Sequence, residues 1–262
     1  MKGIILAPTR VDLDITNEDA VKKMIREYRP SVIFHCAAYT AVDKAEEEQE
    51  KCYQVNVLGT KYLTEAAKEM DAKIIYISTD YVFDGTKEGL YQVEDKVNPV
   101  NYYGKTKYLG ENFVCAYDNH IIVRISWVFG INGKNFIRTM LNLAESHKEL
   151  NVVCDQIGSP TYTKDLAGLL VNMFLSNVKG LYHVTNEGYC SWYEFAEFIF
   201  KESRKKVKVH PILTKDYKTI AKRPLNSKLS KESLDDIGMK RLPEWQDAVK
   251  RYICELKKEG VK

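Results

Sequence analysis

The stretch "KIIYISTDYVFDG" (residues 73–85) decides the fold. An apolar, strand-forming run ends abruptly in three polar residues, Ser78, Thr79 and Asp80. Parallel α/β sheets bind their ligands at the carboxyl ends of the strands, so this pattern indicates a strand that leads into a site. Taken alone, the same residues would also fit a turn capped by an aspartate.

Strand-like and helix-like segments alternate on both sides of this stretch. Helices are predicted for "NEDAVKKMIREY" (17–28), with Asp14, Thr16 or Asn17 as its cap, and for "VLGTKYLTEAAKEM" (57–70). The run "SVIFHCAA" (31–38) is typical of a strand buried on both faces. A helix from about residue 102 leads to the strand "HIIVRIS" (120–126). The pattern predicts a Rossmann-like, doubly wound parallel sheet.

The alternation becomes irregular after residue 130. Helices are expected at 135–147, 163–175 and 191–206 and from Trp245, and strands at 150–155 and 180–185. We therefore expect a Rossmann-like domain made of residues 1–130 and about 163–185. A smaller α/β lobe would comprise about 131–162 and 186–262.

Bulk properties narrow the class of protein. The 262 residues carry a net charge of +3, which does not argue for a nucleic acid partner. No apolar run approaches a membrane span, and the start lacks a signal-peptide pattern. The six cysteines and five histidines show no metal-ligand spacing. We expect a cytoplasmic protein with reduced thiols, no metal and no membrane partner.

Tyr103 and Lys107 stand four residues apart and so share one face of the predicted helix. An ammonium beside a phenol lowers its pKa, which would let Tyr103 protonate a ketone oxygen as it accepts hydride. In a chain with 17 tyrosines the spacing alone is weak, but Thr79 at a nearby strand end strengthens it. In "CAAYTAVDKAE" (36–46), Ala37 and Ala38 leave room for a flat group, or for close helix packing.

Six segments in order extend this interpretation to most of the chain. They are "ISTDYVFDG" (77–85), "NYYGKTKYLGEN" (101–112), "RISWVFG" (124–130), "NFIRTMLNLA" (135–144), "DQIGSPTYTKDLA" (155–167) and "AKRPLNSKLS" (221–230). Together they resemble the dTDP-4-dehydrorhamnose reductase family, extended members of the short-chain dehydrogenase/reductase superfamily. The resemblance implies reduction of the 4-keto group of dTDP-4-dehydro-L-rhamnose by NADPH, with NADH also allowed. It is compatible with a homodimer.

The resemblance also implies roles for individual residues. It gives Thr79, Tyr103 and Lys107 as the catalytic group, with Tyr103 and Lys107 also touching the cofactor. Asp14, Ile15, Ala37, Ala38 and Thr40 match cofactor positions, and Asp80, Tyr81, Trp127, Asn135, Phe136 and Arg223 match positions for the sugar nucleotide. The planar fork of Arg223 suits a diphosphate.

Several of these residues could equally have a purely structural role. Trp127 would equally be a buried strand aromatic, and Arg223 a solvated charge in a lysine-rich tail. Tyr81 and Phe83 would equally belong to the core.

The family's glycine-rich turn after the first strand has no counterpart here. "GIILAPTRVDLDIT" (3–16) aligns with the family's second strand and the segment after that strand, and the near match "GINGKNF" (130–136) lies far downstream. Such a turn holds the cofactor pyrophosphate on backbone N–H groups. Either "GIILA" (3–7) moves into the central strand position beside 32–37, or the strand comes from elsewhere, such as another chain.

Two functions of different class are compatible with these features. The first is an NAD(P)H-dependent reductase with weakened cofactor binding, by at least about tenfold or 1.4 kcal/mol. The alternative is a catalytically weak sugar-nucleotide-binding or regulatory relative. The intact Thr79, Tyr103 and Lys107 favour the enzyme.

Overall fold

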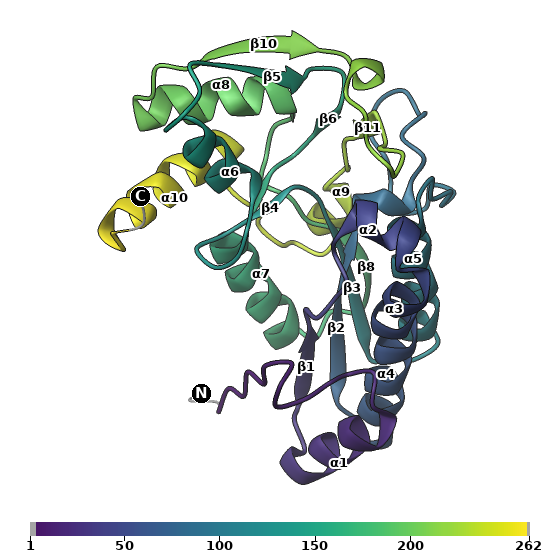
Figure 1. Ribbon diagram of the computed structural model, residues 1–262. Coiled ribbons are helices and arrows are strands. Elements are labelled where there is room, and N and C mark those ends of the chain that lie inside the picture. Colours follow the sequence, from purple (N-terminus) through teal and green to yellow (C-terminus); the bar gives the residue numbers. More distant parts are fainter. Residues whose placement is uncertain (1–3, 261–262) are drawn as a thin grey trace.

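The computed structural model describes residues 4–260 and is built around a parallel sheet of four strands (Figure 1). The strand order is β1-β2-β3-β8. The strands are β1 (Val32–His35), β2 (Lys73–Thr79), β3 (His120–Ile125) and β8 (Gly180–His183), and all three pairings are parallel. Each of these strands was expected from its apolar run, so the predicted α/β class is confirmed.

The two central strands place alternate side chains on opposite faces of the sheet. Tyr76 and Ile122 face α1 (Glu18–Tyr28), α4 (Gly59–Glu69) and α5 (Tyr102–Cys115) in one apolar cluster. Ile75 and Ile121 face α7 (Thr163–Leu175) and α9 (Glu232–Asp235) in a second cluster. Helices therefore cover both faces, which is the doubly wound arrangement.

Between β1 and α4 the chain forms helical segments that the sequence pattern does not predict. They are α2 (Val42–Glu47), α3 (Gln49–Tyr53) and a π-helical turn (Gln54–Leu58) that runs directly into α4. π-turns are rare and occur often at functional sites. Helix α1 itself begins as predicted, because Asn17 accepts a hydrogen bond from the Ala20 backbone N–H.

A second part of the molecule lies above the carboxyl ends of these strands (Figure 1). Its core joins α6 (Phe136–Leu143), α8 (Trp192–Ser203) and α10 (Trp245–Lys258) with β5 (Glu149–Val153) and β10 (Lys208–Ile212). Short pairings complete it, between β4 (Val128–Phe129) and β7 (Thr161–Tyr162) and among β11 (Asn226–Ser227), β6 (Ile157–Gly158) and β9 (Cys190–Ser191). Two short turns, Asp80–Val82 and Thr214–Asp216, connect elements.

The prediction that "GIILA" forms a strand beside β1 was wrong for residues 4–7, and Gly3 lies outside the described residues. Residues 4–9 have no regular structure, and Ile4 and Ile5 are 93% and 91% exposed. Ile4, Ile5 and Leu6 are all exposed, so the hydrophobic effect gives these residues little drive to join the sheet. A turn follows, in which Asp12 accepts from the N–H and hydroxyl of Thr9 and the Leu13 N–H bonds to the Thr9 carbonyl.

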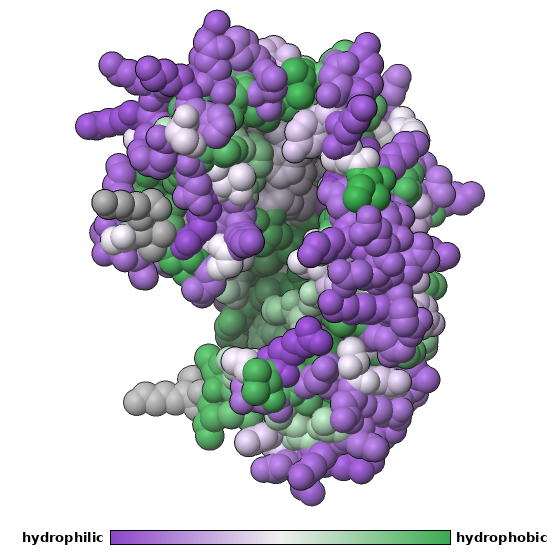
Figure 2. All heavy atoms as spheres, viewed as in Figure 1, coloured by the Kyte–Doolittle hydropathy of each residue, from purple (hydrophilic) through white to green (hydrophobic). Residues whose placement is uncertain are grey.

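Strand β1 consequently forms an edge of the sheet, not a strand buried on both faces. Phe34 is 39% exposed, and of the four strand residues only His35 is buried. A hollow separates the two parts of the molecule, and hydrophobic side chains lie on its floor (Figure 2). Among residues 4–260, no helix has the length and apolar character needed to cross a membrane.

Candidate active site

The site begins where β2 ends. Thr79 caps the short turn Asp80–Val82, because its hydroxyl oxygen accepts a hydrogen bond from the Tyr81 N–H at 3.2 Å. The same hydroxyl donates to Asp80 Oδ1 at 3.0 Å, and both side chains are buried. The polar run after β2 is therefore both a capped turn and a cluster of buried polar groups at the carboxyl end of the sheet.

Helix α5 lies directly on this turn. Asn101 caps the helix by accepting a hydrogen bond from the Gly104 N–H at 2.8 Å. A Cβ at position 104 would stand 2.1 Å from the Tyr81 carbonyl oxygen, so only glycine permits this approach. Tyr103 is thereby placed edge-on to the Tyr81 ring, with centroids 5.8 Å apart, and shares a side-chain hydrogen bond with Thr79.

Lys107 lies one helical turn further along α5 and is 2% exposed. Its ammonium donates to the Ile77 carbonyl at 2.7 Å and sits 4.0 Å from the centroid of the Tyr76 ring. Burial lowers the pKa of Lys107 to about 7, and the charge of Glu111 opposes that shift. A lysine held this way changes charge near neutral pH.

The expectation that Lys107 lowers the pKa of Tyr103 is not met in this structure. Burial raises the pKa of Tyr103, the hydrogen bond with Thr79 opposes the rise, and the nearby charge of Asp80 adds to it. The desolvation of the phenolate outweighs the charge effects, because the Lys107 ammonium points to the Ile77 carbonyl. Tyr103 therefore holds its proton more tightly than a free phenol in this structure.

Asp80 and Tyr81 stand beside this pair. Burial raises the pKa of Asp80 to about 6, although hydrogen bonds from Ser227 and Thr79 oppose the rise. Asp80 Oδ2 is buried without a hydrogen-bond partner in the part of the chain that is described. Burial also raises the pKa of Tyr81, and the Asp80 charge adds to it. A buried, half-satisfied carboxyl at this position suits a polar substrate group.

The expected cofactor residues after β1 form an open strip. Ala37 and Thr40 are exposed and Ala38 is half-buried, at the sheet edge that β1 forms. The strip is held by Asn56, whose amide oxygen accepts from the Tyr39 N–H at 2.8 Å and whose amide nitrogen donates to the Tyr39 carbonyl. Asn56, on the π-turn, was not predicted from the sequence, since a lone asparagine in a helical run gives no signal.

The other two expected cofactor residues, Asp14 and Ile15, contact other residues of the chain. Asp14 accepts hydrogen bonds from the N–H and hydroxyl of Thr16, which lower its pKa. Ile15 packs against Gly59 at the start of α4, where a Cβ would come within 2.7 Å of its side chain. The first turn of α1 comes next and is acidic, with Glu18 and Asp19, which disfavours an anion there.

Three of the expected substrate residues lie in the second part of the molecule. Trp127 has a positive φ of 48°, and its ring stacks on that of Trp192 with the ring centroids 3.6 Å apart. The ring centroid of Phe136 lies 4.6 Å from that of Trp192. Asn135 caps α6 and donates to the Tyr252 hydroxyl at 3.0 Å. Trp127 is half-buried and lies between β3 and β4, so it is not a buried strand aromatic, and its contact with substrate stays a prediction.

Arg223 reaches back across the chain to α2. Its guanidinium donates to Asp43 Oδ2 at 2.7 Å and to the Ala221 carbonyl at 2.8 Å, and its side chain is 15% exposed. The alternative that Arg223 is a solvated charge is therefore wrong. Asp43 was not foreseen, because its partner lies 180 residues away.

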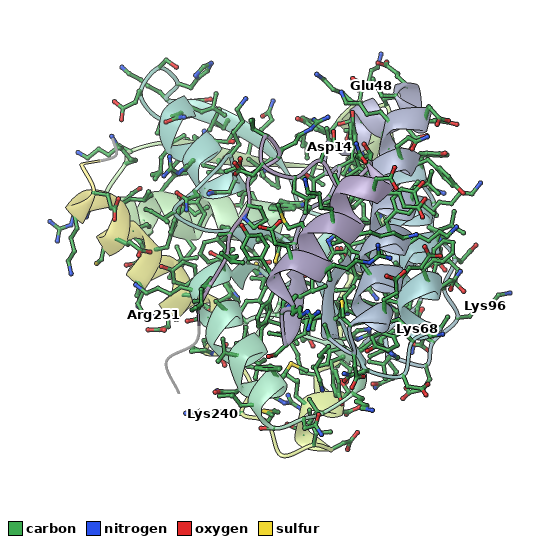
Figure 3. All side chains as sticks on the ribbon, turned by 90° about the horizontal axis from the view of Figure 1, so that it is seen from below. Asp14, Glu48, Lys68, Lys96, Lys240 and Arg251 are labelled. Carbon is green, nitrogen blue, oxygen red and sulfur yellow. The ribbon has the colours of Figure 1, made fainter. Side chains whose placement is uncertain are left out.

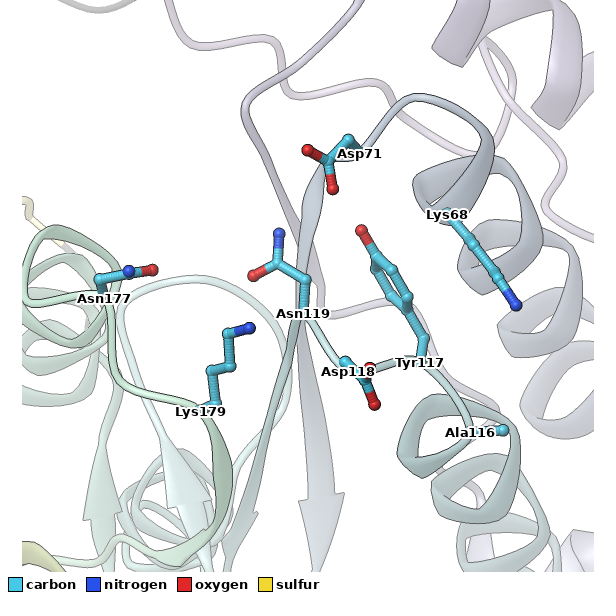
Figure 4. A pocket seen from close by; sticks show the side chains of 8 residues that line it. All are labelled: Lys68, Asp71, Ala116, Tyr117, Asp118, Asn119, Asn177 and Lys179. Carbon is cyan, nitrogen blue, oxygen red and sulfur yellow. The ribbon is translucent and has the colours of Figure 1, made fainter.

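A different hollow lies at the opposite end of the sheet (Figure 4). It is lined by Lys68, Asp71, Tyr117, Asn119, Asn177 and Lys179, among others. Several of these residues come just before β2, β3 or β8, at the amino ends of the strands. Ligands of parallel sheets bind at the other end, so the catalytic candidates remain those after β2.

A threonine, a tyrosine and a lysine gathered at the carboxyl end of a doubly wound sheet define the class of short-chain dehydrogenase/reductase folds. The sequence profile described as the RmlD substrate binding domain matches residues 2–258. The dTDP-4-dehydrorhamnose reductase of Aggregatibacter actinomycetemcomitans is 43% identical over 259 residues, covering 94% of this chain and 88% of the relative. The chain belongs to the dTDP-4-dehydrorhamnose reductase family.

Solved structures agree with this assignment. The reductase of Bacillus anthracis in complex with NADP superposes with a TM-score of 0.92 at 41% identity, covering 94% of this chain and 88% of that one. The ortholog from Clostridium acetobutylicum gives a TM-score of 0.93 at 44% identity, with 95% and 89% covered. The family predicted from the motifs is confirmed.

Proposed function

We propose that this protein reduces the 4-keto group of dTDP-4-dehydro-L-rhamnose to give dTDP-L-rhamnose, using NADPH. The observation that carries the proposal is the buried group of Thr79, Tyr103 and Lys107 at the carboxyl end of β2. Relatives about 40% identical over nearly the whole chain bear the name of this reductase. A module that only bound sugar nucleotides would not need a buried tyrosine and lysine in this arrangement.

We infer that residues 1–130 and about 163–185 hold the cofactor and the catalytic group. The remaining segments, about 131–162 and 186–262, would hold the sugar nucleotide. The separate apolar core of the second part supports this division, although α9 packs on the sheet of the first part through Leu234. Trp127 and Phe136 would contact the substrate from that part, and Arg223 would bind its diphosphate.

The protein's own groups would each serve one purpose in the reaction. The cofactor supplies hydride to the ketone carbon when it is bound. Tyr103 donates its proton to the ketone oxygen as that oxygen gains negative charge, and Thr79 donates a hydrogen bond to the same oxygen. Lys107, when protonated, stabilises the tyrosinate that remains. Asp80 and Tyr81 would orient the sugar hydroxyls beside Tyr103.

The described residues fit one end of NADPH better than the other. At the nicotinamide end, Lys107 is buried beside Tyr103, and the open strip at Ala37 and Ala38 leaves the backbone accessible. At the other end, the first turn of α1 is acidic and "PTRVDLD" (8–14) contains no glycine, so these residues do not suit a phosphate. We infer that the cofactor binds through its nicotinamide half and that its phosphates are held weakly.

The test is turnover with defined substrates. Purified protein is mixed with dTDP-4-dehydro-L-rhamnose and NADPH, and loss of absorbance at the reduced nicotinamide band is followed while the sugar product is identified. We expect NADPH oxidation that depends on the sugar nucleotide, and a slower rate with NADH. Binding of dTDP without any oxidation at saturating NADPH would instead favour the weak-binding relative. Light scattering would test the homodimer in the same preparation.

A further inference from the structure

The catalytic face of α5 extends one turn beyond the two expected residues. Tyr103, Lys107 and Glu111 are spaced at i, i+4 and i+8 and so lie along one stripe of the helix. Glu111 is 2% exposed, although a buried carboxylate is costly unless it is well paired. The spacing was visible in the sequence, but only the burial of Glu111 distinguishes it from a solvent-facing carboxylate.

Glu111 is bound to two neighbouring strands of the sheet. Arg124 on β3 pairs with it through both carboxylate oxygens, at 2.9 Å to Oε1 and 2.7 Å to Oε2. Ser78 on β2 donates to Oε1 at 2.5 Å. Arg124 and Ser78 are 3% and 2% exposed, so the whole cluster is shielded from solvent. One carboxylate thus joins α5 to both central strands.

The bond to Ser78 falls between the two atoms that the reaction needs on β2. The residue before it, Ile77, supplies the carbonyl that accepts the Lys107 ammonium at 2.7 Å. The residue after it, Thr79, supplies the hydroxyl beside Tyr103. A shift of α5 along β2 would therefore change both contacts together, and the Glu111 cluster opposes that shift.

Glu111 also differs in charge from the other groups around Lys107. The titratable groups that face Lys107 are His35 and Cys36 at the end of β1, Cys52 on α3, Tyr76 on β2, and Tyr103 and Glu111 on α5 itself. Burial lowers the pKa of His35 to about 3 and raises the pKa values of Cys36, Cys52, Tyr76 and Tyr103, so these groups are neutral near pH 7. The carboxylate is the negative charge among them.

We propose that Glu111 is a positioning residue for the Tyr103–Lys107 pair: its buried carboxylate fixes α5 on β2 and β3 and keeps the Lys107 ammonium charged. The proposal rests on the proposed reductase function for its catalytic meaning. Its geometric content is the hold of Glu111 on β2 and β3 through Ser78 and Arg124, together with its place one helical turn from Lys107 on the same face of α5. Of the charged neighbours, Glu111 raises the pKa of Lys107 most, in opposition to burial.

The test measures the Lys107 charge directly, without turnover. Protein labelled with ¹³C and ¹⁵N in lysine is titrated by NMR, and the Lys107 Cε–Nζ signal is assigned by its loss in Lys107→Met. The variant Glu111→Gln keeps the shape, because an amide can still accept from Arg124 and donate to Ser78. We expect the midpoint of Lys107 to fall by at least about one pH unit, as removal of a nearby opposite charge implies.

Glu111→Gln leaves Arg124 buried without a counter-charge, which can prevent folding. The double variant Glu111→Gln/Arg124→Met removes both charges, and because loss of the Arg124 cation partly offsets loss of the carboxylate, the Lys107 midpoint should fall by less than in Glu111→Gln. Asp165→Asn is the matched control, since it breaks the Asp165–Arg251 pair between α7 and α10 at 2.7 Å. Arg251 lies on the α10 side of the molecule, away from α5 (Figures 1 and 3). The control should leave the Lys107 midpoint unchanged.

An unchanged Lys107 midpoint in folded Glu111→Gln would overturn the proposal, and so would a higher midpoint in the double variant. If the parent turns over substrate, the alkaline limit of kcat should also move to lower pH in the variants, with KM for the sugar nucleotide within about threefold. If the parent shows no turnover but the Lys107 midpoint still shifts in the variants, the coupling is supported and the reductase function is contradicted. The two conclusions are therefore separable.

Discussion

The expected cofactor-binding region has two ends, one near Thr79 and Lys107 and one near the start of the chain, and they differ in burial. At the catalytic end, Thr79 and Lys107 are at most 6% exposed and are held by bonds from β2 and α5. At the other end, Ile4 and Ile5 are more than 90% exposed, and the turn at Thr9 carries the chain away from the sheet. The candidate catalytic residues are therefore buried, whereas the segment at residues 4–7 is exposed.

This contrast shows that the catalytic arrangement depends on few elements. Tyr103 and Lys107 are positioned by the packing of α5 on β2, through Gly104, Asn101 and the Glu111 cluster. None of these contacts involves residues 4–17. Chemistry and cofactor affinity are therefore expected to respond to different changes, and four experiments test that separation.

The largest effect is expected from Tyr103→Phe. Loss of a general acid costs about 10²–10⁴ in rate, while binding of dTDP and NADPH should stay within about threefold. Stopped-flow or steady-state NADPH oxidation measures the rate, and calorimetry measures the binding. Tyr102→Phe, one residue earlier on α5, is the matched control and should keep turnover near the parent value. Parent-like turnover in Tyr103→Phe would rule out this residue as proton donor.

The second experiment compares stability at the two ends. Ile75→Ala removes a fully buried side chain from β2, and such a change costs about 2–5 kcal/mol. Ile5→Ala, at 91% exposure, should change the free energy of unfolding by less than about 0.5 kcal/mol. Urea denaturation followed by circular dichroism measures both. A large loss in Ile5→Ala would mean that residues 4–8 pack in solution.

The third experiment concerns the diphosphate. Arg223→Ala should weaken dTDP binding by about 1.5–3 kcal/mol, the value of a charge-assisted hydrogen bond, as read by calorimetry. Asp43→Asn serves as the control, because it weakens the hold on Arg223 and leaves the guanidinium in place. Binding in that variant should equal or exceed the parent value. Equal losses in both variants would show that the ion pair acts only on structure.

The smallest expected effect is on the affinity for NADPH, which we expect to depend on the largely exposed end at residues 4–17. NADPH should bind this chain at least about tenfold more weakly than the Bacillus anthracis relative, a difference of 1.4 kcal/mol. Fluorescence titration of both proteins in one buffer measures the ratio. A dissociation constant in the micromolar range or below for this chain would contradict the expectation. Arg10, 74% exposed on its side chain, would then be the first group to test as a phosphate ligand.

The α/β class and the candidate catalytic residues could be predicted from the sequence alone. Periodicity predicted β2, β3, α5 and α7, because long apolar runs and amphipathic helices keep their structure wherever they pack. The spacing of Tyr103 and Lys107 placed them on one face, since a helix repeats every 3.6 residues. These features are local, so no knowledge of distant partners was needed.

Only the tertiary structure decided which partners these residues have. "GIILA" reads as a strand, yet residues 4–7 form no strand beside β1, and Ile4 and Ile5 remain exposed. Arg223 pairs with Asp43 across 180 residues, and Asn56 holds the strip at Tyr39. Burial, not the neighbouring ammonium, governs the pKa of Tyr103. Each of these results depends on groups far apart in the chain, whose energies of burial and pairing exist only once the chain has folded.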